Sequence, residues 1–245
     1  MRIIVFGAHP DDMEIGMGGT IAKHVEAGDD ILMVVATVPS QRELRTQEAR
    51  AGAEVLGARL EILDIPPDDL GVNRRTIREF DRLLTSVDPH LVYTHWDQDS
   101  HQDHNAVSRA ILAAGRRNRC SVLMYEQTIP GGVTPGGFKA QSFVDITDYI
   151  DRKCRSILVH RTQIDQNGGD WWLDGVRGRA MYRGWLRCAW RVGVGGIAPW
   201  MFAPDSRPDD WDDFTFYYRD GTRPEDPLNR YTDLIIEAVG RSGRR

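Results

Sequence analysis

The first half of the chain alternates short apolar runs with longer segments of helical period. Five runs are expected to form strands, near residues 2–7, 30–36, 59–63, 90–95 and 121–126. Four helical segments lie between them, near residues 15–28, 42–57, 73–87 and 104–118. Each is long enough for a right-handed crossover between parallel strands. The alternation therefore predicts an α/β chain with a Rossmann-like, doubly wound and mainly parallel sheet.

The second half is less regular. Prolines and glycines within 130–137 predict a loop before a strand near 142–146 and a helix near 147–162. Six of the seven tryptophans fall within residues 165–213. We predict a Rossmann-like core over residues 1–163 and a Trp-rich C-terminal elaboration over residues 164–245, which belongs to the same domain and shapes the ligand site.

Composition excludes several classes. The formal net charge of −5 removes the electrostatic case for nucleic acid. Three widely spaced cysteines suit neither a disulfide framework nor a Cys-x-x-Cys zinc site. The longest apolar run, residues 31–38, is too short to span a bilayer, and the N-terminus lacks the pattern of a signal peptide. We expect a soluble cytoplasmic protein, with the question of a homo-oligomer left open.

Polar clusters follow the first and fourth expected strands. His9-Pro10-Asp11-Asp12-Met13-Glu14 follows the first, and Trp96 to His104 follows the fourth. Ligands bind outside the carboxyl ends of strands in doubly wound sheets, so the clusters are expected to meet. The nearby Gly16-Met17-Gly18-Gly19 does not match the dinucleotide-binding fingerprint, because Ile21 stands where the third glycine is needed. The carboxylates before this helix would also repel the negative charge of a pyrophosphate.

A bound cation accounts for the first cluster. His9 and Asp12 offer an imidazole and a carboxylate across a tight turn. The alternative is a solvated helix start, since acidic residues favour the first turn. The second cluster favours a metal site over this alternative, because it contains His101 and His104 with carboxylates nearby. His95 is a further candidate ligand, although a hydrogen-bonded role at the strand end is favoured.

These two motifs, Ala8 to Glu14 and His101-Gln102-Asp103-His104, resemble those of the PIG-L/LmbE deacetylases. The resemblance covers residues 1–163. It includes Glu43 to Ala49, similar to the family's R-x-x-E-A segment, and His160-Arg161-Thr162-Gln163, similar to its H-x-S-Q segment with threonine in place of serine.

The resemblance implies that His9, Asp12 and His104 bind Zn²⁺, although Fe²⁺, Co²⁺ or Mn²⁺ suits the same ligands. It also implies that Asp11 is the general base and that His101 acts as acid or oxyanion stabiliser. Zinc-bound water would then attack the acetamide carbonyl.

Other carboxylates have expected roles around this centre. Asp103 or another carboxylate would hold a cationic His101. Some family members carry an oxyanion-stabilising tyrosine two residues before the first histidine of the second motif. Asp99 occupies that position here, and it is expected to contact the substrate or to orient His101.

Two pairs are expected to contact substrate. Arg45 and Glu48 lie near the ligand-binding edge and suit sugar hydroxyls, the alternative being an exposed helical ion pair. Trp171 and Trp172 are expected to cover the site, the alternative being buried bulk or oligomer contacts.

A basic stripe recurs every four residues, at Arg179, Arg183, Arg187 and Arg191. We expect it to be solvated, with an anionic substrate or an anionic membrane surface as the alternatives.

These features predict a zinc-dependent deacetylase, a hydrolase of a linear amide C–N bond, acting on an N-acetylglucosamine-type sugar or glycoconjugate. Two alternatives remain: a metal-dependent amidase for another small N-acyl substrate, and a non-catalytic zinc- or carbohydrate-binding protein. The presence of both Asp11 and His101 argues against a mere binder. The sequence leaves the aglycone open.

Overall fold

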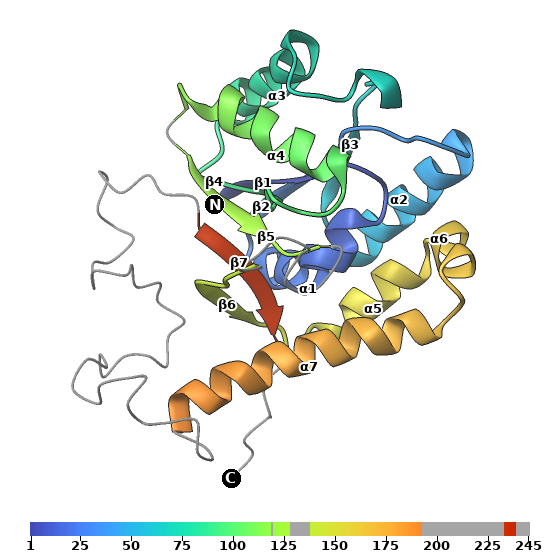
Figure 1. The fold of residues 1–245 in the computed structure, drawn as a ribbon, viewed down its shortest axis with the longest axis vertical. Helices are drawn as coiled ribbons and strands as arrows, with labels where there is room; N and C mark the ends of the chain where they lie inside the picture. The colour runs from blue at the N-terminus through green and yellow to red at the C-terminus, as the bar shows by residue number, and fades with distance from the viewer. Residues whose placement is uncertain (119, 128–137, 193–232, 239–245) are drawn as a thin grey trace, which may run out of the picture.

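The computed structural model describes residues 1–118, 120–127, 138–192 and 233–238, which form a seven-stranded sheet with helices on both faces (Figure 1). The strands are β1 (Arg2–Gly7), β2 (Asp30–Val35), β3 (Arg59–Ile62), β4 (Leu91–His95), β5 (Ser121–Tyr125), β6 (Ser142–Asp145) and β7 (Asp233–Ala238). The helices are α1 (Asp12–Glu26), α2 (Arg42–Leu56), α3 (Arg74–Val87), α4 (Gln102–Gly115), α5 (Ile150–Leu158), α6 (Arg161–Gln166) and α7 (Trp171–Val192), with a 3-10 turn η1 (Pro67–Asp69).

The strand order is β3-β2-β1-β4-β5-β7-β6, and every neighbouring pair is parallel. The chain leaves β1 toward β2 on one side and later returns to β4 on the other. This reversal of direction is the arrangement at which α/β sheets bind ligands. The predicted doubly wound, mainly parallel sheet is therefore confirmed.

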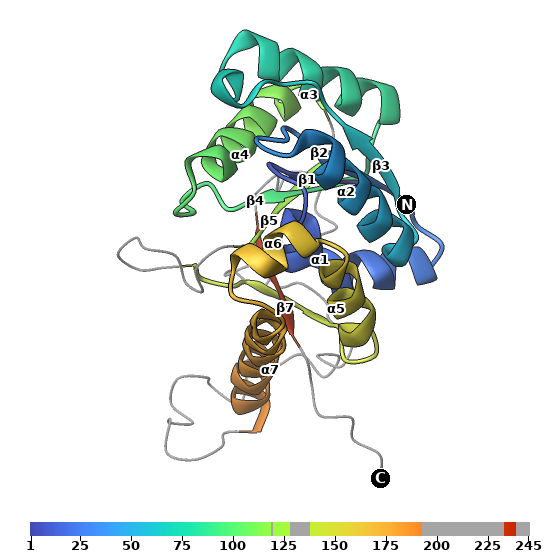
Figure 2. The same ribbon diagram turned by 90° about the vertical axis from the view of Figure 1, so that its right-hand side faces the viewer.

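Both faces of the sheet are buried, which explains why its central strands are apolar throughout. Successive side chains of a strand point to opposite faces, so Ile3 and Val5 pack with α1 and α2, while Ile4 and Phe6 pack with α3 and α4. Figure 2 shows α3 and α4 on one side of the sheet and α1, α2 and α5 on the other. The ligand edge is thus held between two helical layers.

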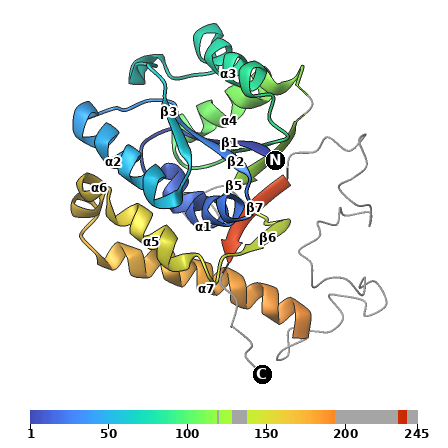
Figure 3. The ribbon, with the colours of Figure 1, turned by 180° about the vertical axis from the view of Figure 1, so that it is seen from behind.

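The C-terminal half contributes more to the sheet than the sequence suggested. The expected strand near 142–146 is β6, and the expected helix near 147–162 is divided, with α5 ending at Leu158 and α6 beginning at Arg161. β7 was not expected, and it lies between β5 and β6. In Figure 3, α7 runs along the side of the molecule that carries α5 and β6.

Several sequence-based expectations lie outside the described residues. They concern the loop over 130–137 and, among the tryptophans, Trp200 and Trp211. The division of the chain at residue 163 stays a prediction. Within the described ranges, the helices lack the combined length and apolar character needed to cross a membrane.

Candidate metal centre and active site

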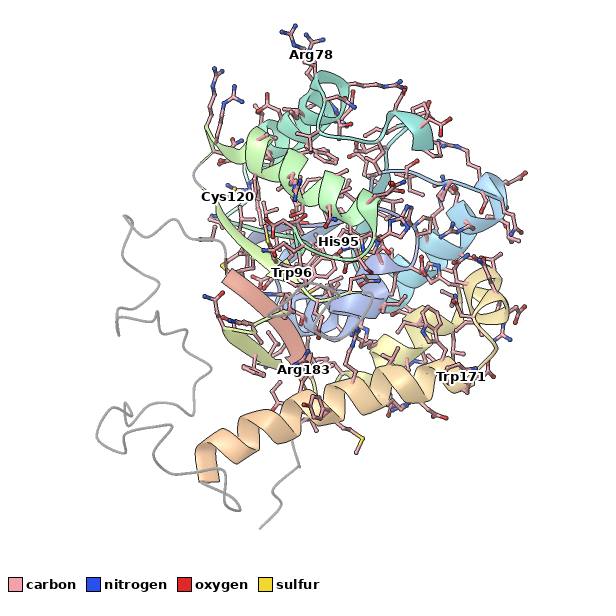
Figure 4. All side chains as sticks on the ribbon, viewed as in Figure 1. Arg78, His95, Trp96, Cys120, Trp171 and Arg183 are labelled. Atoms are coloured by element: carbon pink, nitrogen blue, oxygen red, sulfur yellow. The ribbon has the colours of Figure 1, made fainter. Side chains whose placement is uncertain are left out.

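The loops after β1 and β4 meet at the carboxyl ends of these paired strands, as predicted. The ring of His9, from the first loop, lies 4.9 Å from that of His101 and 5.7 Å from that of His104 between centroids. His95, at the end of β4, stacks on His104 with centroids 3.9 Å apart and ring planes 2° apart. Four imidazoles thus gather near the centre of the sheet, where Figure 4 labels His95.

The turn between β1 and α1 has an unusual backbone conformation. Asp11, which precedes α1, has a φ of 93°, in the left-handed region that costs a non-glycine residue about 1–3 kcal/mol. The backbone N–H of His9 closes the turn by donating to Oδ2 of Asp12 at 2.7 Å. The turn thereby presents three chemically active side chains from one short segment.

Asp12 lies between two histidines. Its Oδ1 is 3.4 Å from Nε2 of His104, and its Oδ2 is 3.1 Å from Nε2 of His95. Burial would raise the pKa of Asp12, but His104 and His95 outweigh burial and hold this pKa well below its usual value. Burial would lower the pKa of His104, yet Asp12 and Asp99 raise it to about 10. A carboxylate therefore faces an imidazolium, and a metal cation would displace that proton.

Two further carboxylates orient imidazoles. Oδ1 of Asp99 lies 3.1 Å from Nδ1 of His104 and accepts the backbone N–H of His101 at 2.8 Å. Oδ2 of Asp103 lies 2.9 Å from Nε2 of His9. Such carboxylates fix the orientation of metal-binding imidazoles. Asp103 was expected to hold His101, but its carboxylate contacts His9. Asp99 is buried beside His104, and its expected contact with a substrate stays a prediction.

The donor set fits a divalent cation. Two groups of three side chains among the described residues have ligand atoms within 4.8 Å of one another: His9, His101 and His104, and Asp12, His95 and His104. The predicted triad of His9, Asp12 and His104 takes members from both groups. Imidazoles with one carboxylate suit catalytic zinc. Fe²⁺, Co²⁺ and Mn²⁺ can use the same donors.

The contacts of His95 agree with the expected hydrogen-bonded role at the end of β4. Its Nε2 accepts the backbone N–H of Ala8 at 3.0 Å, which links the ends of β1 and β4. Burial, together with the neighbouring His104, lowers the pKa of His95 to about 4. Nε2 of His95 therefore lies between the backbone N–H of Ala8 and the carboxylate of Asp12, at the end of β4.

His101 precedes α4 and caps it. Its Nδ1 accepts the backbone N–H of Asp103 at 3.2 Å, so a neutral ring carries its hydrogen on Nε2. Partial burial and the charges of His104 and His9 lower the pKa of His101. The arrangement favours a neutral hydrogen-bond donor at His101, where a cation was expected.

Asp11 is buried and is held from α2. Nη2 of Arg45 donates to Oδ1 of Asp11 at 3.3 Å and to the backbone O of Pro10 at 3.1 Å. Burial, reinforced by the charge of Asp12, raises the pKa of Asp11 to about 7. A carboxyl group with this pKa exchanges protons near neutral pH, as a general base does. Arg45 thus supports the Asp11 turn, and its expected contact with sugar hydroxyls stays a prediction.

Comparison with known proteins assigns the chain to a family. A family model described as PIG-L: GlcNAc-PI de-N-acetylase matches residues 4–115. The uncharacterized deacetylase YaiS of Escherichia coli is 31% identical over 186 residues, which cover 65% of this chain and 90% of YaiS. The chain belongs to the PIG-L family.

Other relatives agree with membership of the PIG-L family. The diacetylchitobiose deacetylase of Thermococcus kodakarensis is 27% identical over 207 residues, covering 75% of this chain and 78% of that protein. Among solved structures, the 4-carboxy-2-hydroxymuconate hydratase GalB of Pseudomonas putida has a TM-score of 0.65 at 23% identity, covering 80% of this chain and 91% of GalB. The structural likeness shows the fold alone, because one fold serves different reactions.

Two further segments that resemble PIG-L motifs meet where α2 contacts the start of α6. Glu48 accepts the backbone N–H of Thr162 at 2.9 Å and its hydroxyl at 2.6 Å. Thr162 replaces the usual serine of the PIG-L segment but keeps the hydroxyl that Glu48 requires. Glu48 was expected on the substrate or paired with Arg45. It joins α2 to α6, and its expected contact with a substrate stays a prediction.

The two predicted substrate tryptophans of this PIG-L family member begin α7, and their role in covering the site stays a prediction. Trp172 packs partly buried against Ile15, Ile157 and Ile164, so burial of apolar area explains its position. Trp171 is 64% exposed, and Figure 4 shows it near the start of α7, well apart from His95.

Two contacts near the PIG-L motifs were not predicted. Nε2 of His160 lies 3.1 Å from Oε1 of Glu14, and both side chains are buried. Gln127 donates from Nε2 to Oδ1 of Asp12 at 3.4 Å. Gln127 lies two residues beyond the end of β5, at the edge of the sheet where ligands bind, so its position in the sequence could have indicated a role in the site. Nothing in the sequence pairs Glu14 with His160.

Proposed function

We propose that this chain is a metal-dependent deacetylase that hydrolyses the N-acetyl amide of an N-acetylglucosamine-type sugar or glycoconjugate. The observation that carries the proposal is the histidine–carboxylate cluster at the carboxyl ends of β1 and β4, with Asp11 in the same turn as Asp12. Membership of the PIG-L family supports it, as does similarity to a diacetylchitobiose deacetylase.

His9, Asp12 and His104 are the proposed metal ligands, and zinc is the proposed ion. The ion would supply Lewis-acid chemistry, which lowers the pKa of water and polarises a carbonyl. Asp103 and Asp99 would hold the rings of His9 and His104.

The protein's own groups would carry out the proton transfers. Asp11 would take a proton from the attacking water, and Nε2–H of His101 would donate a hydrogen bond to the amide oxygen as charge develops there. Asp11 would then return the proton to the departing amine. A C–O bond forms and the C–N bond breaks, which releases acetate and a free amino group.

The experiment measures free-amine release by metal-loaded protein from N-acetylglucosamine, N,N'-diacetylchitobiose and a panel of N-acetyl amino acids. We expect release from the sugars, and a loss on the order of 10²- to 10⁴-fold in Asp11→Asn, which keeps the size of the side chain but removes the base. Release from the amino acids alone would support a different amidase. Absence of release from every substrate would contradict the proposal.

A further inference from the structure

The arginine stripe on α7 is turned partly inward. Arg183, labelled in Figure 4, forms an ion pair with the buried Glu126. Arg179 donates from Nη1 to the backbone O of Gln127 at 2.7 Å and from Nη2 to the backbone O of Ile15 at 3.0 Å. These two residues contradict the expected solvated stripe, while the side chains of Arg187 and Arg191 lie outside the described part.

Gln127 links α7 to the proposed metal centre. It is 5% exposed, and its Nε2 donates to Oδ1 of Asp12 at 3.4 Å. Its Oε1 has no hydrogen-bond partner among the described residues. A Cβ added to Gly16 would lie 2.6 Å from that oxygen, so the glycine leaves room for the amide beside α1.

Arg179 contacts the two segments on either side of the Gln127 amide. One of its nitrogens holds α1, the helix that begins at Asp12, through the carbonyl of Ile15. The other holds the segment after β5, through the carbonyl of Gln127. One planar guanidinium therefore fixes the separation between the element that carries Asp12 and the element that carries its amide partner.

We propose that Gln127 is a positioning residue for the carboxylate of Asp12, and that Arg179 holds Gln127 in place. The inference rests on the proposed function, in which Asp12 binds the metal. Hydrogen-bond partners that orient metal ligands are typically worth 10- to 100-fold in metal affinity. Through Arg179, α7 would thus tune metal binding without contributing a ligand.

The test compares metal affinity in Gln127→Met, Arg179→Met and the double variant. Gln127→Met keeps the length of the side chain but removes the donor. Arg177→Met is the matched control, because Arg177 lies on the same helix and pairs with Asp151 at the surface. Dissociation constants for Zn²⁺ and Co²⁺ come from competition with a chelator. The visible spectrum of the Co²⁺-loaded protein reports ligand geometry, and thermal unfolding of the metal-free protein reports folding.

We expect Gln127→Met to weaken metal binding about 10- to 100-fold and to change the Co²⁺ spectrum, with thermal unfolding of the metal-free protein little changed. Arg179→Met should weaken binding as well, whereas Arg177→Met should not. The double variant should bind about as weakly as Gln127→Met alone, because residues that act through one another are not additive.

Wild-type affinity and spectrum in Gln127→Met would overturn the inference. Additive losses in the double variant would show that Arg179 does not act through Gln127. If Arg179→Met fails to fold, the comparison of Gln127→Met with wild type still decides the role of Gln127. Wild-type protein that binds neither ion would contradict the proposed function and this inference together. Tight metal binding without amide hydrolysis would contradict the proposed function alone.

Discussion

Asp12 and His104 form the contact on which the proposed metal site depends. Each stabilises the charge of the other, which lowers the pKa of the carboxyl group and raises that of the imidazole. His101 belongs to the same cluster, but its Nδ1 is occupied by the backbone of α4. Single substitutions at the two histidines should therefore have different consequences.

We predict that His104→Ala contains much less zinc than wild type and loses activity that added metal restores only in part, because a ligand is deleted. His101→Ala should retain near-stoichiometric metal and lose on the order of 10²- to 10⁴-fold in kcat, because only a transition-state partner is removed. Metal analysis and steady-state kinetics of both variants check this. Metal loss in His101→Ala with retention in His104→Ala would reverse the two roles.

Chain spacing predicted which residues meet but not which atoms pair. His9, Asp12 and His104 gather because their loops follow adjacent parallel strands, a property visible in the sequence. Asp103 contacts His9 instead of His101, since that choice depends on side-chain directions in the first turn of α4. Arg45 was expected to contact substrate because of its position at the ligand-binding edge. Its contact with Asp11 depends on how α2 packs against the Asp11 turn.

At the scale of elements, one buried carboxylate joins α2 to α6. Glu48 receives two hydrogen bonds from Thr162, one from the backbone and one from the hydroxyl. Hydrogen bonds to a charged group contribute about 1.5–3 kcal/mol, and a buried charge that loses its partner is costly. The hydroxyl at this position is therefore expected to matter more than the methyl group beside it.

Thr162→Val should lower the free energy of unfolding by about 1.5–3 kcal/mol, because it keeps the shape of the side chain but removes one donor to Glu48. Thr162→Ser is the matched control and should stay within about 1 kcal/mol of wild type, since it keeps the hydroxyl. Urea unfolding of the three proteins measures the difference. Equal stability of the valine and serine variants would show that the hydroxyl is not needed.

Elements with strong local patterns were predicted, and those defined by distant pairing were not. β1 to β5 are short apolar runs separated by amphipathic helices, so local sequence was sufficient. β7 is also a short apolar run, but only its pairing with β5 and β6 identifies it as an interior strand. His160 lies at the break between α5 and α6, and its contact is with Glu14, more than a hundred residues away, which local sequence does not reveal.

At the scale of the molecule, the amino end of the sheet carries its own charge cluster. Asp29 accepts from the N-terminal amine of Met1 and lies 2.7 Å from Nδ1 of His24, whose Nε2 lies 3.0 Å from the hydroxyl of Tyr93. Burial would raise the pKa of Asp29, but the hydrogen bonds from the amine and His24 outweigh burial and lower it. The folded state therefore favours the ionised carboxylate.

Because this pKa is lower in the folded state, the stabilisation is complete above the unfolded value of about 4 and is lost as pH falls through the folded value. We predict that Asp29→Asn lowers the free energy of unfolding by about 1–2 kcal/mol at pH 7, and that the difference from wild type shrinks below about pH 4. Urea unfolding from pH 7 to pH 2 measures it. Asp64→Asn, at a 92% exposed side chain paired with Arg42, should change stability by less than about 0.5 kcal/mol. A pH-independent difference for Asp29→Asn would contradict the assignment.

The place of β7 between β5 and β6 has a consequence for the order in which the nascent chain can fold. β7 pairs with both β5 and β6, so among the described strands β6 has no neighbour until residues 233–238 have been synthesised. While the ribosome is still making the C-terminal half, the five strands from β3 to β5 can assemble, with β5 as an open edge that invites wrong pairing. β6 can therefore join the described sheet only together with β7 or after it, so the described sheet is completed only once residues 233–238 have left the ribosome.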